Sequence, residues 1–158
     1  PRSLLHVMRI AISTGGGDAP GLNAVIRAAV LAALNRGWDV LGIKRGYAGL
    51  LGEDEVIPLT RDTVRGIAHM GGTILRTTNR GSPFNYPIPQ ADGSITYVDR
   101  SDELMANARA LGIDAIVSIG GDGSLRIAQQ LVHKGMKVVC VPKTIDNDVP
   151  CTINTFGF

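Results

Sequence analysis

Residues 116–124 read Ile-Val-Ser-Ile-Gly-Gly-Asp-Gly-Ser, an apolar run of strand length that ends in glycines, one carboxylate and one hydroxyl. A helical pattern follows directly, so the stretch predicts a strand, a tight turn and a helix. The glycines leave backbone amides open to a ligand, and Ser124 is expected to cap the helix, whose positive end favours anions. We interpret the stretch as a phosphate-binding turn in which Asp122 can hold a cation. A plain strand-to-helix connection without a ligand is the alternative.

Length and composition describe a globular α/β chain. Its 158 residues suffice for one domain with a sizeable core, or for part of a larger protein. The hydrophobic content of 44% and the 20 glycines, against 4% aromatic residues, favour an aliphatic core with tight turns over an aromatic β-sandwich. The formal net charge of +2 is too small to indicate a nucleic-acid surface or a membrane-binding face, so we expect neither partner.

The cysteine content and the apolar runs indicate a cellular compartment. Cys140 and Cys151 are too few for a disulfide framework, and reduced thiols are the simpler interpretation. No apolar run approaches the roughly 18 residues of a membrane span, and residues 1–8 lack the features of a signal peptide. We therefore expect a soluble, cytoplasmic protein.

The first part of the chain predicts a β-turn-α-β unit. Its expected elements are a strand at 6–14, a glycine-rich turn at 15–21, a helix from Leu22 that ends at Gly37, and a strand at 39–44. This order is typical of parallel sheets with right-handed crossovers.

The middle of the chain predicts shorter elements. They are a loop with at most one helical turn at 45–52, an extended segment at 55–59, a helix from Thr60 to Gly71 with Val64, Ile67 and Ala68 on one face, a brief strand at 73–75, and an exposed loop at 76–92. The loop could cover a ligand, and surface padding is the alternative.

The last part repeats the strand and helix alternation. We expect a helix from Ser101 that buries Leu104, Ala108 and Leu111, the strand at 116–119, a helix from Ser124 to Lys134, and a buried parallel strand at 137–141. The whole pattern predicts an α/β fold, a doubly wound and mostly parallel sheet with helices on both faces. Ligands of such sheets bind beyond the carboxyl ends of the strands.

Three turns that follow strands, beginning at Gly15, Gly120 and Pro142, are therefore expected at one edge of the sheet, where they could form one site. The first turn matches neither of two standard phosphate-binding templates. The residues Leu22-Asn23 replace the Lys-Ser/Thr of a P-loop, and Pro20 takes the third glycine position of the dinucleotide fingerprint. Phosphate binding through backbone amides remains the expectation.

The third turn, PKTIDNDVP at 142–150, concentrates reactive groups. Asp146 and Asp148 flank Asn147, and Lys143 and Thr144 precede them. Such a group could take a proton from an alcohol while it holds an anionic partner. An Asx-rich turn without a catalytic role is the alternative.

Four motifs together resemble the 6-phosphofructokinase family, in the same order and spacing. They are TGGGDAPGLNAVIRA at 14–28, GGT at 71–73, IGGDGS at 119–124 and PKTIDND at 142–148. NAD kinases and diacylglycerol kinases share the GGDG turn, and PKTIDND distinguishes the chain from them. The resemblance implies a phosphofructokinase-like N-terminal domain of an enzyme that phosphorylates the 1-hydroxyl of fructose 6-phosphate in glycolysis, with ATP as donor and Mg²⁺ as cofactor.

The resemblance also implies roles for the matching residues. Asp146 matches the general base, Thr144, Ile145 and Asp148 match its substrate-binding neighbours, and Asp122 matches the magnesium-associated carboxylate. Nucleotide or phosphate contacts are implied for Gly16, Gly17, Tyr47, Gly81, Gly121, Gly123 and Ser124. Arg80 resembles the arginine that clamps a phosphate, and Arg76 is its rival.

Three residues bear on the phosphoryl donor, one of which favours ATP. Gly123 favours ATP, because a glycine leaves room for a nucleotide where the aspartate of pyrophosphate users would fill and charge the space. Lys143 instead matches the pyrophosphate users and could reach phosphate oxygens, which makes pyrophosphate the alternative donor. Ile127 replaces a glycine that bacterial ATP users carry near the adenine.

The resemblance also implies what lies outside this chain. Family members run well beyond this length, so residues 1–158 correspond to the nucleotide- and phosphate-binding domain, without the second half that completes the sugar-phosphate site. We expect the fragment alone to be inactive or nearly so, and the full-length protein to be a homo-oligomer, a dimer or a tetramer. A nucleotide-binding module without catalysis is the alternative from another functional class.

Overall fold

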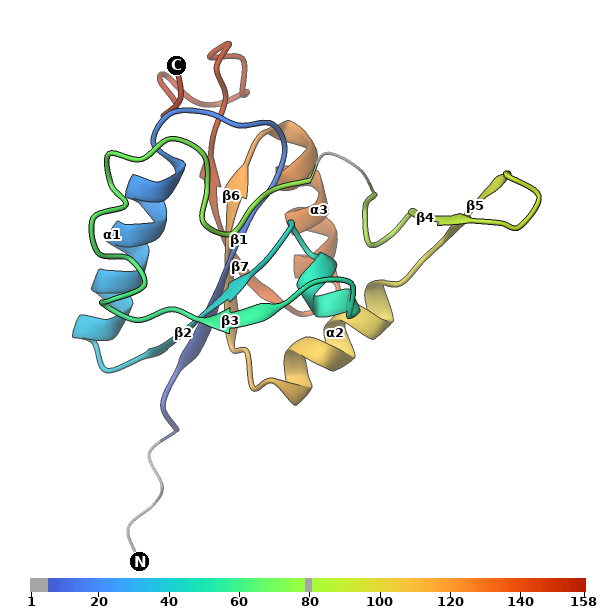
Figure 1. The fold of residues 1–158 in the computed structure, drawn as a ribbon, viewed down its shortest axis with the longest axis horizontal. Coiled ribbons are helices and arrows are strands. Elements are labelled where there is room, and N and C mark those ends of the chain that lie inside the picture. Colours follow the sequence, from blue (N-terminus) through green and yellow to red (C-terminus); the bar gives the residue numbers. More distant parts are fainter. Residues whose placement is uncertain (1–5, 79–80) are drawn as a thin grey trace, which may run out of the picture.

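A five-stranded sheet forms the centre of the computed structural model, which describes residues 6–78 and 81–158 (Figure 1). The strand order is β3-β2-β1-β6-β7. The strands span Arg9–Thr14 (β1), Asp39–Ile43 (β2), Val56–Pro58 (β3), Ala115–Gly120 (β6) and Lys137–Pro142 (β7). Strands β1, β2, β6 and β7 are parallel, and β3 is antiparallel to β2. The expected mostly parallel sheet is confirmed.

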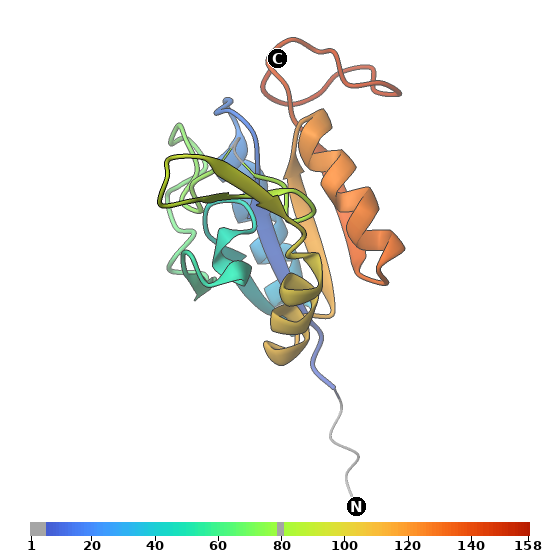
Figure 2. The ribbon, with the colours of Figure 1, turned by 90° about the vertical axis from the view of Figure 1, so that its right-hand side faces the viewer.

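Helices cover both faces of this sheet, as expected for a doubly wound fold. Figures 1 and 2 show α1 (Leu22–Asn35) on one face, and α2 (Ser101–Ala110) and α3 (Asp122–His133) on the other. Neighbouring residues of a strand point to opposite faces, so β1 contributes Ile12 to the core beneath α1 and Ala11 to the core beneath α2 and α3. The short helix η1 (Ala48–Leu51) is the single helical turn expected in the loop at 45–52.

The strand order changes direction at β1, in the centre of the sheet. The chain runs outward from β1 to β2 and β3 on one side, and β6 and β7 lie on its other side. Thr14 of β1 lies opposite Ile119 of β6, and Gly15 N–H donates to the Ile119 carbonyl oxygen over 2.9 Å. The loops that follow these two strands therefore begin side by side, where open α/β sheets bind their ligands.

Residues 60–75 form turns, so the helix expected from Thr60 and the strand expected at 73–75 are both wrong. One helical hydrogen bond forms, from Val64 N–H to the Thr60 carbonyl oxygen over 3.3 Å, but Gly66 then takes a left-handed φ of 74°. Val64 and Ile67 are buried, whereas Ala68 is exposed. The turns therefore bury two of the three apolar residues of the predicted helical face without a helix.

The expected loop at 76–92 contains the first strand of a hairpin, so that prediction is wrong in part. Strand β4 (Tyr86–Pro89) pairs antiparallel with β5 (Ile95–Val98), and the hairpin extends away from the sheet in Figure 1. Gly93, with φ 83°, allows the tight turn between the two strands. The Asp92-Gly93 pair, which is preferred in tight hairpin turns, was the available sequence signal.

Strand β7 lies at the edge of the sheet, although the sequence pattern predicts a buried strand for residues 137–141. Val139 is 63% exposed and Cys140 is exposed as well. An apolar run is common to central and edge strands, so composition alone could not separate them. Leu111, expected on the buried stripe of α2, follows the helix and is 37% exposed, because the helix ends at Ala110.

The cysteines and the helices bear on two further expectations from the sequence. Cys140 and Cys151 are both free and exposed, as the absence of a disulfide framework predicts. Within the described ranges, no helix has the length and apolar character needed to cross a bilayer.

Arg100 attaches the base of the hairpin to the body of the protein. Its guanidinium donates to Glu53 over 2.5 Å, to Glu103 over 2.7 Å and to the Leu51 carbonyl oxygen over 2.9 Å. The same group lies over the ring of Tyr86, 4.9 Å from the centroid. A two-stranded hairpin is marginally stable alone, so these contacts with η1 and α2 hold it in place.

We expect Arg100→Ala to lower the free energy of unfolding by about 1–2 kcal/mol, because a mostly buried guanidinium with several partners is lost. Urea denaturation measures this change. Arg109→Ala, on the exposed side of α2, is the control and should change stability by less than about 0.5 kcal/mol. Equal effects of the two substitutions would contradict the role given to Arg100.

Candidate functional site

Three loops meet at the carboxyl ends of β1, β6 and β7. Lys143 N–H donates to the Gly120 carbonyl oxygen over 3.0 Å, which joins the third loop to the second. The Lys143 ammonium donates to the carbonyl oxygens of Gly15, over 3.4 Å, and of Gly17, which joins the third loop to the first. The structure thus brings together the three turns in which the sequence places candidate site residues.

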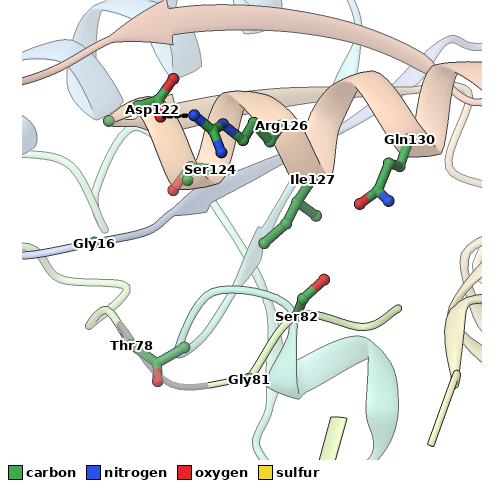
Figure 3. Close-up of a pocket in the computed structure, with 11 residues that line it drawn as sticks. Gly16, Thr78, Gly81, Ser82, Asp122, Ser124, Arg126, Ile127 and Gln130 are labelled. Atoms are coloured by element: carbon green, nitrogen blue, oxygen red, sulfur yellow. Dashed lines mark ion pairs between the residues drawn. The ribbon is translucent and has the colours of Figure 1, made fainter. Parts of the chain in front are cut away.

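A cavity of about 440 Å³ lies beside α3 and is large enough for a nucleotide-sized ligand. In Figure 3, Ile127 and Gln130 project from α3 toward the segment that carries Gly81 and Ser82. The lining residues come from the first loop, from this segment and from the start of α3: Gly16, Thr78, Gly81, Ser82, Gly121, Asp122, Gly123, Ser124, Arg126, Ile127 and Gln130. We call it the larger cavity.

A second cavity, of about 270 Å³, lies between the first and third loops. Its lining includes Gly17, Asp18, Lys143, Thr144, Ile145 and Asp148. We call it the smaller cavity. Gly16, Gly121 and Asp122 line both cavities, so a group placed beside these three residues borders both.

The backbone amides of the first loop differ in whether they are free to bind a ligand. Gly16 N–H donates to the Thr78 carbonyl oxygen over 3.1 Å. The N–H groups of Gly17 and Asp18 donate to no atom in the part of the chain that the structure describes. Exposed adjacent amides without an internal acceptor can bind an anion. Gly17 is therefore better placed than Gly16 to meet a phosphate with its amide, a distinction that the sequence does not contain.

Ser124 does not cap α3, so that prediction is wrong. The helix begins at Asp122, its N-cap is Gly121, and no side chain bonds to the cap. Ser124 instead packs against the glycines of two loops. A Cβ added at Gly120 would lie 2.5 Å from the Ser124 Cβ and 3.1 Å from the Gly15 carbonyl oxygen. Gly120 is thus needed for close packing within the protein.

Gly123 has the opposite surroundings. A Cβ added there would meet no atom within 4 Å, and the residue lines the larger cavity. Its lack of a side chain therefore leaves space for a ligand and has no packing role in the described structure.

Asp122 stands at the start of α3, where it bonds to Arg126 with a separation of 2.8 Å between oxygen and nitrogen (Figure 3). The Asp122 side chain is 56% exposed. No group of three or more His, Cys, Asp or Glu side chains among the described residues could enclose a metal ion. Magnesium in phosphate sites needs only one or two carboxylates, with phosphate oxygens and waters as further ligands. Asp122 fits that requirement as a single protein ligand.

The candidate residues of the third loop form a hydrogen-bonded turn. The Thr144 hydroxyl donates to Asp148 Oδ1 over 2.7 Å and accepts from Asp146 N–H over 3.1 Å. Farther along, Thr144 N–H donates to the Phe156 carbonyl oxygen over 3.4 Å, so the end of the chain folds back on the turn. Asp146 is exposed and lines neither cavity, although its neighbours Ile145 and Asp148 line the smaller one.

Tyr47 lies beneath the surface of the site. It is 8% exposed, its hydroxyl donates to Ser118 Oγ over 3.3 Å, and burial raises its pKa to about 12. The residue does not line the larger cavity; it lines a neighbouring cavity of about 150 Å³ that shares Thr78 and Gly81 with it. Tyr47 therefore supports the wall of the site from within.

The structure describes only one of the two arginines that the sequence offers as a phosphate-binding residue. Arg80 lies outside the described residues. Arg76 is exposed and has a left-handed φ of 58°, and its carbonyl oxygen accepts from the Thr14 hydroxyl over 2.7 Å. Neither cavity is lined by Arg76.

Sequence reasoning missed several residues of the site. Thr77 donates through its hydroxyl to the Gly16 carbonyl oxygen, and Ser82, Arg126 and Gln130 line the larger cavity. Thr77 and Ser82 belong to an irregular segment without a motif. Arg126 and Gln130 lie at helical spacing after Asp122, and this spacing was the available signal.

The family model described as phosphofructokinase matches residues 9–158. The chain is 49% identical over 153 residues to ATP-dependent 6-phosphofructokinase 2 of Clostridium perfringens, which covers 96% of this chain and 42% of that protein. It is 47% identical over 152 residues to ATP-dependent 6-phosphofructokinase 1 of a Nostoc species, covering 95% of this chain and 41% of that protein. The chain thus spans less than half the length of these curated relatives.

Solved structures agree with this fold. A structure of Pichia pastoris phosphofructokinase in the T-state matches with a TM-score of 0.79 and 31% identity, over 98% of this chain and 17% of that one. A pyrophosphate-dependent phosphofructokinase from Marinobacter aquaeolei matches with a TM-score of 0.69 over 92% of this chain and 36% of that one. At 22% identity, the second match shows a shared fold alone.

We expect Gly120→Ala to lower the free energy of unfolding by about 1–3 kcal/mol, because the added methyl group overlaps Ser124 and has no room to move. Gly123→Ala is the matched control in the same turn. It should leave stability unchanged or raise it slightly, because the site is open and alanine favours a helix. Thermal and urea unfolding of both variants measure the difference, and similar losses in both would contradict the packing role of Gly120.

Proposed function

The chain belongs to the phosphofructokinase family, and we propose that it binds the donor in an enzyme that transfers a phosphoryl group from ATP to the 1-hydroxyl of fructose 6-phosphate. The observation that carries this proposal is the pair of cavities that share Gly16, Gly121 and Asp122. Phosphoryl transfer needs a donor and an acceptor on opposite sides of the transferred group, with electrostatic stabilisation around it. Two cavities with a common glycine-rich wall suit that requirement.

In this proposal, ATP occupies the larger cavity and the sugar hydroxyl approaches through the smaller one. The transferred group lies beside Gly16 and Gly121, within reach of the free amides of Gly17 and Asp18. The N-terminus of α3 points its positive end at the same place. Both features stabilise negative charge that develops on the phosphoryl oxygens.

Asp122 would hold Mg²⁺ together with donor phosphates. When bound, the ion would neutralise charge on the phosphates and help to orient the donor. Release of Arg126 from its ion pair with Asp122 would leave a guanidinium at the rim of the larger cavity, where it can bind phosphate oxygens.

Asp146 would act as the general base. Its carboxylate would take the proton from the 1-hydroxyl as the oxygen attacks the phosphoryl group. Thr144 and Asp148 hold the turn in shape through the hydrogen bond between them. Because Asp146 lies beside the cavities and is exposed, we propose that bound sugar phosphate and a second domain outside residues 1–158 complete its surroundings.

ATP is the favoured donor. The larger cavity suits a nucleotide, Gly123 leaves it open, and the relatives described above are named ATP-dependent. Lys143, the residue that matches pyrophosphate users, lines the smaller cavity and is bound to the first loop. We further propose that the full-length protein is a cytoplasmic homo-oligomer, which light scattering and cell fractionation would test.

Asp146→Asn in the full-length protein should lower kcat by about 10²- to 10⁴-fold, because the amide cannot accept the proton. The KM values for ATP and fructose 6-phosphate should change little, since amide and carboxylate have the same shape. Steady-state assays measure both parameters. Asp62→Asn, the same change at an exposed carboxylate in the turns at 60–75, serves as a control with unchanged kcat. An unchanged kcat in Asp146→Asn would remove the base assignment, and a module without catalysis would show no turnover even in the wild type.

Gly123→Asp should abolish turnover with ATP, because the carboxylate would enter the larger cavity and repel the nucleotide phosphates. The open surroundings of Gly123, together with the favourable place of an acid at a helix N-terminus, predict a thermal midpoint at least as high as that of the wild type. Assays with ATP and with pyrophosphate, and Gly123→Ala as the steric control, measure the donor preference. ATP turnover that persists in the stable variant would refute the donor assignment.

A further inference from the structure

Side chains from elsewhere in the chain bind the carbonyl oxygens of the three consecutive glycines, Gly15 to Gly17, of the first loop. The Lys143 ammonium binds the carbonyl oxygens of Gly15 and Gly17. The Thr77 hydroxyl binds that of Gly16. A Cβ added at Gly16 would lie 3.4 Å from Lys143 Nζ, which shows how closely the ammonium approaches the loop.

Lys143 is buried although it carries an ionisable group. It is 5% exposed, and its backbone N–H is bound to Gly120. Burial lowers the pKa of its ammonium, and the nearby Asp18 carboxylate acts in the opposite direction. A buried ammonium requires hydrogen-bond acceptors, and the Gly15 and Gly17 carbonyls supply them. The contact therefore links the end of β7 to the first loop.

This contact has an electrostatic consequence for the loop. Carbonyl oxygens carry partial negative charge and would repel a phosphoryl group that approached them. With Lys143 and Thr77 bound to the carbonyl oxygens of Gly15, Gly16 and Gly17, these oxygens are occupied, while the N–H groups of Gly17 and Asp18 donate to no atom of the described residues. An anion that enters the smaller cavity beside Gly16 and Gly17 then faces free amides instead of free carbonyl oxygens of these glycines, in a cavity that Asp18, Lys143 and Asp148 also line.

We propose that Lys143 is a positioning residue, which holds the carbonyls of the first loop so that the loop presents its amides to the transferred phosphoryl group. It acts through the loop and makes no contact with the donor. The inference rests on the proposed function for the identity of the anion. It differs from the expectation that the side chain of Lys143 reaches a phosphate oxygen.

Hydrogen exchange of the ligand-free full-length protein, measured by mass spectrometry on peptides that cover residues 14–19, tests the contact between Lys143 and the first loop. Lys143→Met keeps the volume of the side chain and removes its charge and its donors. Exchange in this peptide should increase by about tenfold, because the Gly16 amide bond to Thr78 opens more often when the loop is released. Lys137→Met, at the far end of β7, is the matched control and should leave the peptide unchanged.

Kinetics of the same variants test the effect on catalysis. Lys143→Met should lower kcat by at least about tenfold and change the KM for ATP by less than about threefold, because misplaced amides weaken binding of the transition state in particular. Lys143→Arg, which keeps the charge, should recover part of kcat. A role limited to stability would lower the thermal midpoint and leave kcat unchanged below it.

The outcomes separate the inference from the proposed function. Unchanged exchange in Lys143→Met would overturn the contact with the loop, whatever the activity. Faster exchange with an unchanged kcat would overturn the positioning role, and a large rise in the KM for ATP or pyrophosphate with unchanged exchange would show direct contact with the donor. If the wild-type protein transfers no phosphoryl group, the proposed function fails, while the exchange comparison still decides whether Lys143 holds the loop.

Discussion

The close approach of the loops that follow β1 and β6 is the constraint on which the site depends. Ser124 occupies the space that side chains at Gly15 and Gly120 would need, and the two strands pair up to Thr14 and Ile119. This packing places the start of α3 beside the first glycine loop. Gly16 and Gly121, which line both cavities, directly follow Gly15 and Gly120 in the chain, so the close packing of these two glycines brings the common wall of the cavities together.

The glycines of the motif at 119–124 are thus required for different physical reasons. Gly120 allows two loops to pack, whereas Gly123 leaves a cavity open. The motif read as a sequence suggests that all of its glycines serve a ligand. Only the atoms around each Cα show whether a glycine is needed for packing or for ligand binding. This difference decides which substitution changes stability and which changes ligand binding.

Much of the architecture followed from the sequence, because parallel strands with intervening helices leave strong apolar patterns. The strands β1, β2 and β6 and the helices α1 and α3 lie close to their expected ranges. The turns at 60–75 were mistaken for a helix, since buried residues such as Val64 and Ile67 can be spaced helically without helical hydrogen bonds. The meeting of the three loops at one edge of the sheet was predicted correctly, but the available amides, the buried Tyr47 hydroxyl and the contact of Lys143 depend on atoms that no motif describes.

The hairpin of β4 and β5 has one further property. Pro87 and Pro89 alternate with Tyr86 and Ile88 along β4, so the prolines lie on the edge that faces away from β5. That outer edge has no N–H donors at these positions, and another strand cannot extend the ladder there. The outer edge of β5 (Ile95–Val98) carries no proline, so the hairpin resists the addition of another strand on its β4 side only.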